Sequence, residues 1–322
     1  MKALITSFAL ASSLALAATG AAHAQDYPSK PVTIVVPFTP GGIVDIAARL
    51  VGDELSKKWN QPVIIENRPG GSGVVGASSV TGAAPDGYTI LAAETATAVT
   101  NAWLQQAVPY DFVESFRPVV SISDTPIVLA SWAGSDVTRG TEFFDLARKQ
   151  EVIYASPLAG SLNHLTGEWV ATEAGLKLKH IGYKGGAPAA TALASGEVSF
   201  AFLAYSSALP FVDAGQIRLL AVTGAERSAL APDVPTLKEL GAGDVVTQQW
   251  TGLFVPKATP DEVVAKLNAD VLAVLADPQV QEKFWKSGAT VIPASTDEFA
   301  ARLAADRVTL KDVLTKAGLI GK

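Results

Sequence analysis

Hydrophobic and polar positions along this chain switch repeatedly between the pattern of a strand and that of a helix. Residues 32–36 (VTIVV) are an apolar, β-branched run that is typical of a buried strand. The following segment has apolar residues at the 3.6-residue spacing of a helix with one buried face. These apolar residues are Ile43, Ala47, Leu50, Val51 and Leu55.

The same alternation continues through most of the chain and predicts an α/β fold with largely parallel sheets. A second unit is expected to begin near residues 124–126, and residues 248–251 are interpreted as the return crossing. A long helix is predicted from Ser161 to about Ala174. Further strands are predicted at residues 62–66, 88–92, 152–155, 178–183, 198–203, 217–222 and 252–255.

Two segments near the C-terminus have the spacing of a capping box, a Ser or Thr followed three residues later by an acid. Thr259 and Glu262 have this spacing, with Pro260 at the first helical position. Ser295 and Glu298 repeat it. We therefore expect one helix to begin at each box.

The first 24 residues have the pattern of a secretory signal peptide. Lys2 gives a positive start, residues 3–18 are mostly apolar, and residues 22–24 (AHA) fit a small-x-small cleavage motif before Gln25. The apolar run is too short to span a membrane. The chain has no cysteine, which excludes disulfides, cysteine nucleophiles and lipid attachment at the cleavage site. We expect an exported, periplasmic protein that is not a lipoprotein.

The charge composition argues against binding to polyanions. The chain has 25 Lys and Arg residues against 31 Asp and Glu residues, a net charge of −6. A mildly acidic chain with scattered charges gives no support for binding to nucleic acid or to an anionic membrane. An anionic ligand must therefore be held by local donors and dipoles rather than by a positive field of the whole protein.

Possible enzyme motifs each have a simpler structural interpretation. Residues 71–76 (GSGVVG) match G-x-G-x-x-G, but residues 67–70 separate them from the preceding strand, so we interpret them as a tight loop before a closely packed helix. Ser161 and His164 lack a G-x-S-x-G elbow, and Ser161 fits the N-cap of its helix. After the leader only His164 and His180 remain, without paired metal-ligand spacing. We expect no cofactor, no metal and no catalysis.

Two strand-to-helix loops have the composition of an anion site. They are residues 38–45 (FTPGGIVD) and residues 157–161 (PLAGS). Each helix start offers unpaired N–H groups and about half a positive charge beyond the carboxyl end of a strand. Ordinary βα turns offer the same donors, so both interpretations stand. The hydroxyls of Thr95, Thr97 and Thr100 could bind a ligand or cap local structure, and Asp45 could brace its loop or bind a cationic ligand group.

Seven short motifs follow one another along the chain: YPSKP (27–31), VVPFTPGG (35–42) with Asp45, ENRPG (66–70), PDGYT (85–89), HLTGE (164–168), YKGG (183–186) and DVPT (233–236). Together they resemble the solute-binding proteins of tripartite tricarboxylate transporters, the Bug family. The resemblance covers residues 27–320. It implies a two-domain periplasmic binding protein of the Venus-flytrap, type II-like fold, with the ligand cleft between its domains.

The resemblance also implies a domain division and a role. Residues 25–125 and 251–322 would form a discontinuous domain 1, and residues 126–250 would form domain 2, after a signal peptide at residues 1–24. The protein would be a monomeric receptor that closes on a small carboxylate and delivers it to integral-membrane subunits of the transporter. The alternatives are a subunit that presents a carboxylate to a membrane sensor and an exported α/β enzyme.

Site residues follow from the matching motifs. The resemblance implies that two facing loops hold the carboxylate, partly through ordered water, and Thr95 and Thr97 are the hydroxyl candidates. The first loop supplies Phe38, Thr39, Gly41, Gly42, Ile43, Val44 and Asp45, and the second supplies Ala159, Gly160, Ser161 and Asn163.

One stretch departs from the family. Members often carry an Asp at the end of the strand at residues 198–203, whereas this chain continues with Leu203, Ala204 and Tyr205. We expect these residues to line the site and to favour a less polar ligand, such as an aromatic mono- or dicarboxylate. Simple repacking of this position is the alternative.

Overall fold

The computed structural model describes residues 27–105, 108–316 and 318–320, so the expected signal peptide lies outside the described residues. The N-terminal part follows the predicted strand–helix alternation. Its strands are β1 (Val32–Val36), β2 (Val63–Asn67) and β3 (Thr89–Glu94). Its helices are α2 (Ile43–Trp59), the 3₁₀-helix η2 (Gly71–Gly73), α3 (Val74–Thr81), the π-helix η3 (Ala96–Thr100), α4 (Asn101–Leu104) and α5 (Phe112–Ser115).

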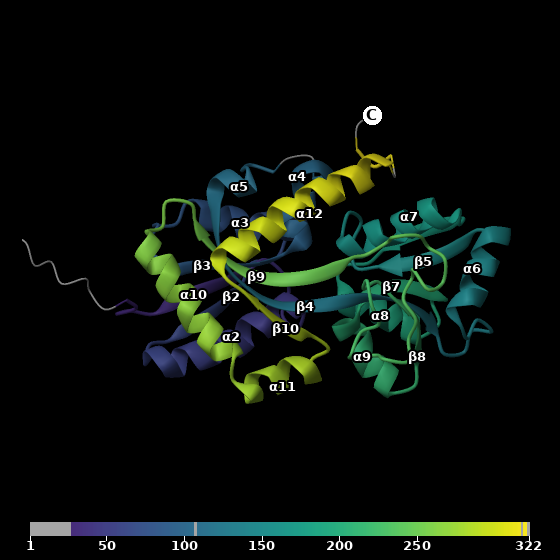
Figure 1. Cartoon of the computed structure of the whole chain (residues 1–322), viewed down its shortest axis with the longest axis horizontal. Coiled ribbons are helices and arrows are strands. Elements are labelled where there is room, and N and C mark those ends of the chain that lie inside the picture. Colours follow the sequence, from purple (N-terminus) through teal and green to yellow (C-terminus); the bar gives the residue numbers. More distant parts are fainter. Residues whose placement is uncertain (1–26, 106–107, 317, 321–322) are drawn as a thin grey trace, which may run out of the picture.

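The middle of the chain forms a second group of elements, and the chain then returns to the first group (Figure 1). The middle group contains β4 (Phe116–Trp132), α6 (Gly140–Lys149), β5 (Val152–Ser156), α7 (Leu162–Ala174), β6 (Leu178–Gly182), α8 (Gly186–Ala194), β7 (Phe200–Ala204), α9 (Tyr205–Asp213) and β8 (Ile217–Val222). The returning part contains β9 (Gln248–Pro256), α10 (Asp261–Leu275), α11 (Pro278–Lys286), β10 (Thr290–Ala294) and α12 (Thr296–Lys316).

The strands pair in the order β2-β1-β3-β9-β4-β7-β5-β6, with β8 and β10 also paired to β4. At the two ends of this order, β1 pairs parallel with β2 and β3, and β5 pairs parallel with β6 and β7. The central strands β4 and β9 pair antiparallel with all their neighbours in the described residues. The prediction of largely parallel sheets was therefore wrong for the centre, because both crossings are strands rather than loops.

Strand β4 passes from one half of the molecule to the other (Figure 1). It pairs with β9 as far as Pro126 and with β7 from Ile127 onward. The crossings expected near residues 124–126 and 248–251 are thus continuous β-strands. The division into domains at residues 125 and 250 remains a prediction.

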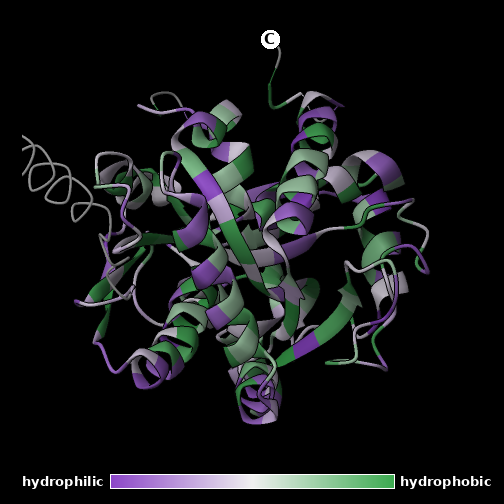
Figure 2. Ribbon diagram, turned by 60° about the vertical axis from the view of Figure 1, so that its left-hand side comes forward, coloured by the Kyte–Doolittle hydropathy of each residue, from purple (hydrophilic) through white to green (hydrophobic). Residues whose placement is uncertain are grey.

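Burial of apolar side chains explains why the helices pack where they do. One cluster lies beneath α2 and α10, a second reaches α12 and α7, and a third fills the space under α8 and α9. Figure 2 shows hydrophobic residues concentrated in the strands and on the helix faces that meet them. Trp250 of β9 is fully buried against Phe254 and Phe299, and its indole N–H donates to Asp306 of α12 (2.7 Å).

The two capping-box predictions had different outcomes. The box at the start of α12 is confirmed, since Glu298 accepts from the Ser295 N–H (2.8 Å) and its own N–H donates to Ser295 Oγ (3.3 Å). The box at Thr259 was wrong. Extended backbone at Pro260 (ψ 147°) delays the start of α10 to Asp261, so Pro260 is the N-cap and provides no side-chain cap.

The loop interpretation of the G-x-G-x-x-G stretch is confirmed. A Cβ on Gly76 would lie 2.7 Å from Pro37 Cα and 2.8 Å from the Arg68 carbonyl, so α3 packs close to the end of β1. Among the described residues, none of the helices combines the length and the apolar character needed to cross a bilayer.

Candidate ligand-binding site

The carboxyl ends of two parallel strand pairs define the candidate site. β1 and β3 are adjacent in one half of the molecule, and β5 and β7 are adjacent in the other. The crossing strands β9 and β4 lie between the two pairs. Ligands of α/β proteins bind beyond such strand ends. The candidate site therefore consists of the segments that follow these strands: residues 37–42, 95–100, 157–161 and 204–206.

Asp45 holds the first of these segments in place. Its carboxylate accepts hydrogen bonds from the Gly41 N–H (2.9 Å), the Arg49 guanidinium (2.9 and 3.0 Å) and Asn67 Nδ2 (2.8 Å). Asn67 Nδ2 also donates to the carbonyl of Phe38 (3.0 Å), so one amide connects both ends of the loop. Both oxygens of Asp45 are engaged inside the loop, which fits the bracing role rather than a contact with a cationic ligand.

These contacts also keep the carboxylate charged. Burial alone would raise the pKa of Asp45, but hydrogen bonds from Arg49, Gly41 and Asn67 outweigh it and hold the pKa below its usual value. Although Asp45 is only 2% exposed, its lowered pKa keeps it ionised at neutral pH, with the Arg49 charge beside it. The pair leaves this loop close to electrically neutral.

Helix α2 starts from this loop with free N–H groups. Its N-cap, Gly42, provides no side-chain cap, and within the described residues no cap hydrogen bond replaces it. Gly41 has a positive φ of +86°, a conformation that favours glycine. Thr39, Gly41 and Gly42 are exposed, whereas Ile43 and Val44 are buried and fix the helix on the sheet. The first turn thus offers unpaired donors and about half a positive charge to an anion.

Thr97 lies beside the same loop. A Cβ on Gly73 would be 2.5 Å from Thr97 Oγ1 and 3.4 Å from Phe38 Cζ, so the three residues meet. The Thr97 hydroxyl is buried and has no protein partner among the described residues. Thr97 belongs to the π-helix η3, a distortion that often occurs at functional sites.

Thr95 does not join this group. Its Oγ1 accepts a hydrogen bond from the Trp250 N–H (3.4 Å). It lines a small hollow with Arg302 and Asp306 of α12. Thr100 is fully buried and bonds the Ala96 carbonyl (3.5 Å).

The second predicted loop, residues 157–161, uses its donors internally. Ser161 Oγ accepts from the His164 N–H (3.2 Å) and donates to the Leu158 carbonyl (2.8 Å), so the predicted N-cap of α7 is confirmed. The Gly160 N–H donates to His164 Nδ1 (3.0 Å). Ala159 is exposed, and Asn163 is 2% exposed with an Nδ2 that has no protein partner in the described part of the chain.

The two halves also touch beside the candidate site. A Cβ on Gly160 would lie 3.4 Å from Leu104 Cδ1 and 3.9 Å from Gln105 Nε2, and Gln105 in turn bonds Ser72 Oγ (3.4 Å). A Cβ on Gly288 would lie 2.8 Å from Ser206 Cα. Because Ser72 precedes Gly73, these contacts connect the second loop to the group around Thr97 and Phe38.

Residues 203–205, at the carboxyl end of β7 and the start of α9, are less available to a ligand than expected. Leu203 is fully buried among apolar side chains of its own half of the molecule. Tyr205 is 7% exposed, and its hydroxyl donates to the Leu230 carbonyl (3.0 Å). Ala204 is the N-cap of α9 and lies opposite Ile127 of β4.

Two histidines, His164 and His180, pack against the second loop. The rings of His164 and His180 stack with centroids 3.9 Å apart, and His180 Nε2 bonds Ser156 Oγ (2.7 Å). Burial lowers the pKa of His164, and burial together with His164 lowers the pKa of His180 to about 4. Both rings are therefore neutral at pH 7, which lets His164 Nδ1 accept the Gly160 N–H. Within the described residues, no group of three His, Asp or Glu side chains is placed to hold a metal ion.

Glu94, at the end of β3, is a site residue that the sequence did not single out. It is 5% exposed, and its carboxylate accepts from the Ala96 N–H (3.0 Å) and from Gln249 Nε2 (3.3 Å). Burial raises the pKa of Glu94 to about 7, although these bonds and one from the Thr97 N–H oppose the rise. The predicted strand ended at residue 92, which hid the position of Glu94 at the strand's carboxyl end.

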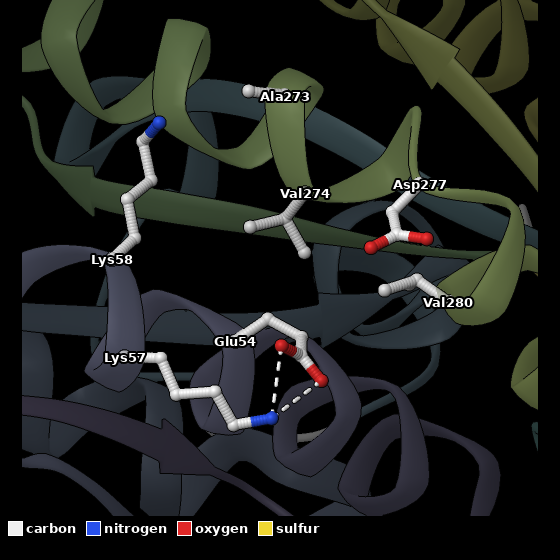
Figure 3. A pocket seen from close by; sticks show the side chains of 7 residues that line it. All are labelled: Glu54, Lys57, Lys58, Ala273, Val274, Asp277 and Val280. Carbon is white, nitrogen blue, oxygen red and sulfur yellow. Dashed lines mark hydrogen bonds and ion pairs between the residues drawn. The ribbon is translucent and has the colours of Figure 1, made fainter.

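A larger hollow of about 360 Å³ lies elsewhere, between α2, α10 and α11 (Figure 3). Glu54 there pairs with Lys57 and Lys283, and Lys58 pairs with Asp270. It lies at the C-terminal end of α2, roughly 20 Å along the helix from Ile43. Glu54, Lys57 and Lys58 are already ion-paired, and Asp277 accepts the Gln279 N–H at the start of α11, so we do not assign this hollow to the candidate site.

Comparison with known proteins identifies the family. Residues 47–319 match the model of the tripartite tricarboxylate transporter family receptor, TctC. The chain belongs to this family. It is therefore a periplasmic solute-binding receptor of the TctC/Bug group, not an enzyme, with the two-domain fold of periplasmic binding proteins.

Curated relatives and solved structures agree. A UPF0065 protein of Bordetella bronchiseptica is 35% identical over 299 residues, covering 93% of this chain and 89% of that protein. Protein BugT of Bordetella pertussis is 32% identical over 278 residues, covering 85% of each. R. palustris Rpa4515 with adipate has a TM-score of 0.87 and 33% identity, covering 91% of this chain and 99% of that one. MatC (Rpa3494) from Rhodopseudomonas palustris with bound malate has a TM-score of 0.81 and 29% identity, covering 89% and 100%.

Proposed function

We propose that this receptor captures a small carboxylate at the N-terminus of α2 and delivers it to the membrane subunits of a tripartite tricarboxylate-type transporter. The uncapped first turn of α2, held by the Asp45 brace, is the observation that carries the proposal. Its N–H groups and helix dipole favour an anion, and the neighbouring Asp45 charge is already neutralised by Arg49.

Three further facts support the carboxylate. The described structures of two similar proteins, Rpa4515 and MatC, contain adipate and malate. The unpaired hydroxyl of Thr97 and the unpaired amide of Asn163 are buried beside the two loops, and a buried polar group without a partner is costly unless a ligand or water completes it. The preference for an aromatic ligand stays a prediction; Leu203 packs within its own half of the molecule and the Tyr205 hydroxyl bonds Leu230, so neither supports it.

The proposal includes export and domain closure. Residues 1–24 would be removed as a signal peptide, leaving a periplasmic protein without a lipid anchor. Residues 25–125 with 251–322 and residues 126–250 would move as two domains about β4 and β9. N-terminal sequencing and the intact mass of the exported protein test the first part: a start at Gln25 without added lipid mass is expected.

Substitution of Gly42 tests the carboxylate site. A Cβ at this position has 3.8 Å to its nearest contact, and an Asp N-cap stabilises a helix, so Gly42→Asp should fold at least as stably as the parent. Its carboxylate would occupy the anion site and repel the ligand. Gly42→Ala is the control, because it fits the same space without a charge.

Calorimetric titration with a panel of small mono-, di- and tricarboxylates is the measurement. We expect the best-bound member to lose about 100-fold in affinity in Gly42→Asp and less than about threefold in Gly42→Ala. Equal affinity in Gly42→Asp and the parent would remove the α2 N-terminus from the site. Uptake of the same carboxylate by cells with and without the protein tests delivery.

A further inference from the structure

A row of polar side chains crosses strands β3, β9 and β4, which connect the two halves of the molecule. In the antiparallel register, Glu94 of β3 lies opposite Thr251 of β9, and Thr251 lies opposite Ser123 of β4. The next row on the same face pairs Gln249 with Thr125. Residues directly opposite in such a sheet share a face, with Cβ atoms about 5 Å apart. Five polar residues therefore form one continuous patch, which we call the floor patch.

The other face of the same strands is directed at α12. Asp124, between Ser123 and Thr125, pairs with Arg302 of α12 (2.9 Å). Trp250 bonds Asp306 of α12. The floor patch is thus on the face that also carries Ala92 and Leu253, beneath α2.

The floor patch also joins the segments of the candidate site. Glu94 ends β3, whose parallel neighbour β1 leads into the α2 loop. Thr125 is two residues before Ile127, which lies opposite Ala204 at the end of β7. The patch therefore extends from one pair of strand ends to the other, as the floor of a site between them must.

Much of the hydrogen-bonding capacity of the floor patch is unused within the protein. Ser123, Thr125 and Thr251 are 1%, 0% and 0% exposed, and their hydroxyls have no partner among residues 27–105, 108–316 and 318–320. Gln249 Oε1 has none there either. Burying four such groups costs stability unless something else bonds them. They therefore point to a ligand or water above the patch.

The environment of Glu94 indicates whether the floor patch favours a cationic or an anionic ligand group. Its hydrogen bonds come from the Ala96 and Thr97 N–H groups and from the Gln249 amide, and no positive side chain among the described residues contributes to them. Two arginines on elements packed against these strands are already paired with other acids, Arg49 with Asp45 and Arg302 with Asp124. A second carboxylate bound one strand spacing away, roughly 5 Å, would be repelled by an ionised Glu94.

We propose that Glu94, with Gln249 Oε1 and the floor hydroxyls, binds an ammonium group of the ligand. Resting on the proposed function, this makes the ligand an amino acid: its carboxylate lies at the α2 N-terminus and its ammonium group over the floor patch. The ligand's positive charge then neutralises Glu94, and Gln249 Oε1 and the three floor hydroxyls can accept its further N–H groups.

Matched ligand series test this assignment at pH 8, where Glu94 is mostly ionised. Succinate, malate and aspartate differ only in the group on C2, as do glutarate, 2-hydroxyglutarate and glutamate; adipate with 2-aminoadipate and butyrate with 4-aminobutyrate extend the set. Affinities are measured by calorimetry for the parent, Glu94→Gln and Asp306→Asn. Asp306 is the control, because it is a buried acid on the opposite face of β9.

In at least one series we expect the amino member to bind 10-fold or more tighter than its partners. Glu94→Gln should reduce that ratio to about threefold or less, and Asp306→Asn should leave it unchanged. If carboxylates bind but the amino members bind no tighter, the ammonium site is wrong while the proposed function stands. A diacid that binds best and loses affinity in Glu94→Gln would mean that neutral Glu94 donates to a second carboxylate, which overturns the assignment. If nothing in the panel binds, both proposals fail.

Discussion

The loops after β1 and after β5 have a similar sequence pattern, but their hydrogen bonding differs. Both place glycine between a strand and a helix start. After β1, the brace comes from a side chain inside the helix, Asp45, and the first turn of α2 keeps its N–H groups free. After β5, Ser161 caps α7 and His164 accepts the Gly160 N–H. A strand–Gly–helix pattern therefore does not make an anion site by itself; what matters is whether nearby side chains have already taken the donors.

Removing the Asp45 carboxylate is expected to have the largest effect on stability and on carboxylate affinity. Asp45→Ala leaves Gly41, Arg49 and Asn67 without their shared acceptor. We expect a loss of about 3 kcal/mol in the free energy of unfolding and at least a 10-fold weaker carboxylate affinity. Urea denaturation and calorimetry measure the two quantities. Asp53→Ala, an exposed acid on the same helix, should change either one little, and equal losses in both variants would disprove the brace.

Acidic pH should destabilise the second loop (residues 157–161) but not the first (residues 38–45). The folded state holds the pKa of His164 and His180 below the unfolded value, so the unfolded chain binds more protons below about pH 6.5. The stability that this pair contributes is therefore complete at pH 7 and is lost as the pH falls toward 4, by roughly 2 kcal/mol.

His164→Asn sharpens this prediction, since its Oδ1 is attached to Cγ as Nδ1 is and can accept the Gly160 N–H without titrating. Glu168, whose Oε1 lies 3.7 Å from His164 Nε2, and the Tyr154 hydroxyl that donates to Glu168 remain in place. Urea unfolding at pH 7, 5.5 and 4.5 should show a shallower decline in the variant. Parallel declines would remove the histidine pair from the explanation.

A smaller effect is expected at the cap of α7. Ser161→Ala loses one N-cap bond, which costs about 1 kcal/mol of stability. Because the hydroxyl already bonds Leu158 and His164, ligand affinity should change less than about threefold. Thermal unfolding and calorimetry separate the two; a 10-fold loss of affinity would show that the second loop contacts the ligand as strongly as the first.

The smallest effect concerns the floor between the loops. Thr251→Val removes a hydroxyl that has no protein partner among the described residues and keeps the shape of the side chain. The ligand-free protein should keep its stability within about 0.5 kcal/mol or gain slightly. A loss above 1 kcal/mol by urea denaturation would mean that the hydroxyl is bonded in the ligand-free protein.

Local signals in the sequence predicted much of the fold and part of the site. The Ser295 box, the Ser161 cap and the β1–α2 loop depend on residues within four positions of one another, and the structure has all three. The antiparallel crossings and the bond from Asn67 to Asp45 depend on pairing between distant segments, which periodicity does not encode. Glu94 was missed partly for the same reason, and partly because the predicted strand ended two residues before it. Its importance comes from Thr251 and Gln249, which lie about 155 residues away along the chain.

A crystal structure with the tightest-binding small carboxylate shows whether the first turn of α2 holds the anion. We expect carboxylate oxygens about 3 Å from backbone nitrogens within residues 41–44. The Asp45–Arg49–Asn67 contacts should be unchanged. A carboxylate bound only to residues 157–161, or in the hollow beside Lys57 and Lys58, would contradict this placement of the anion.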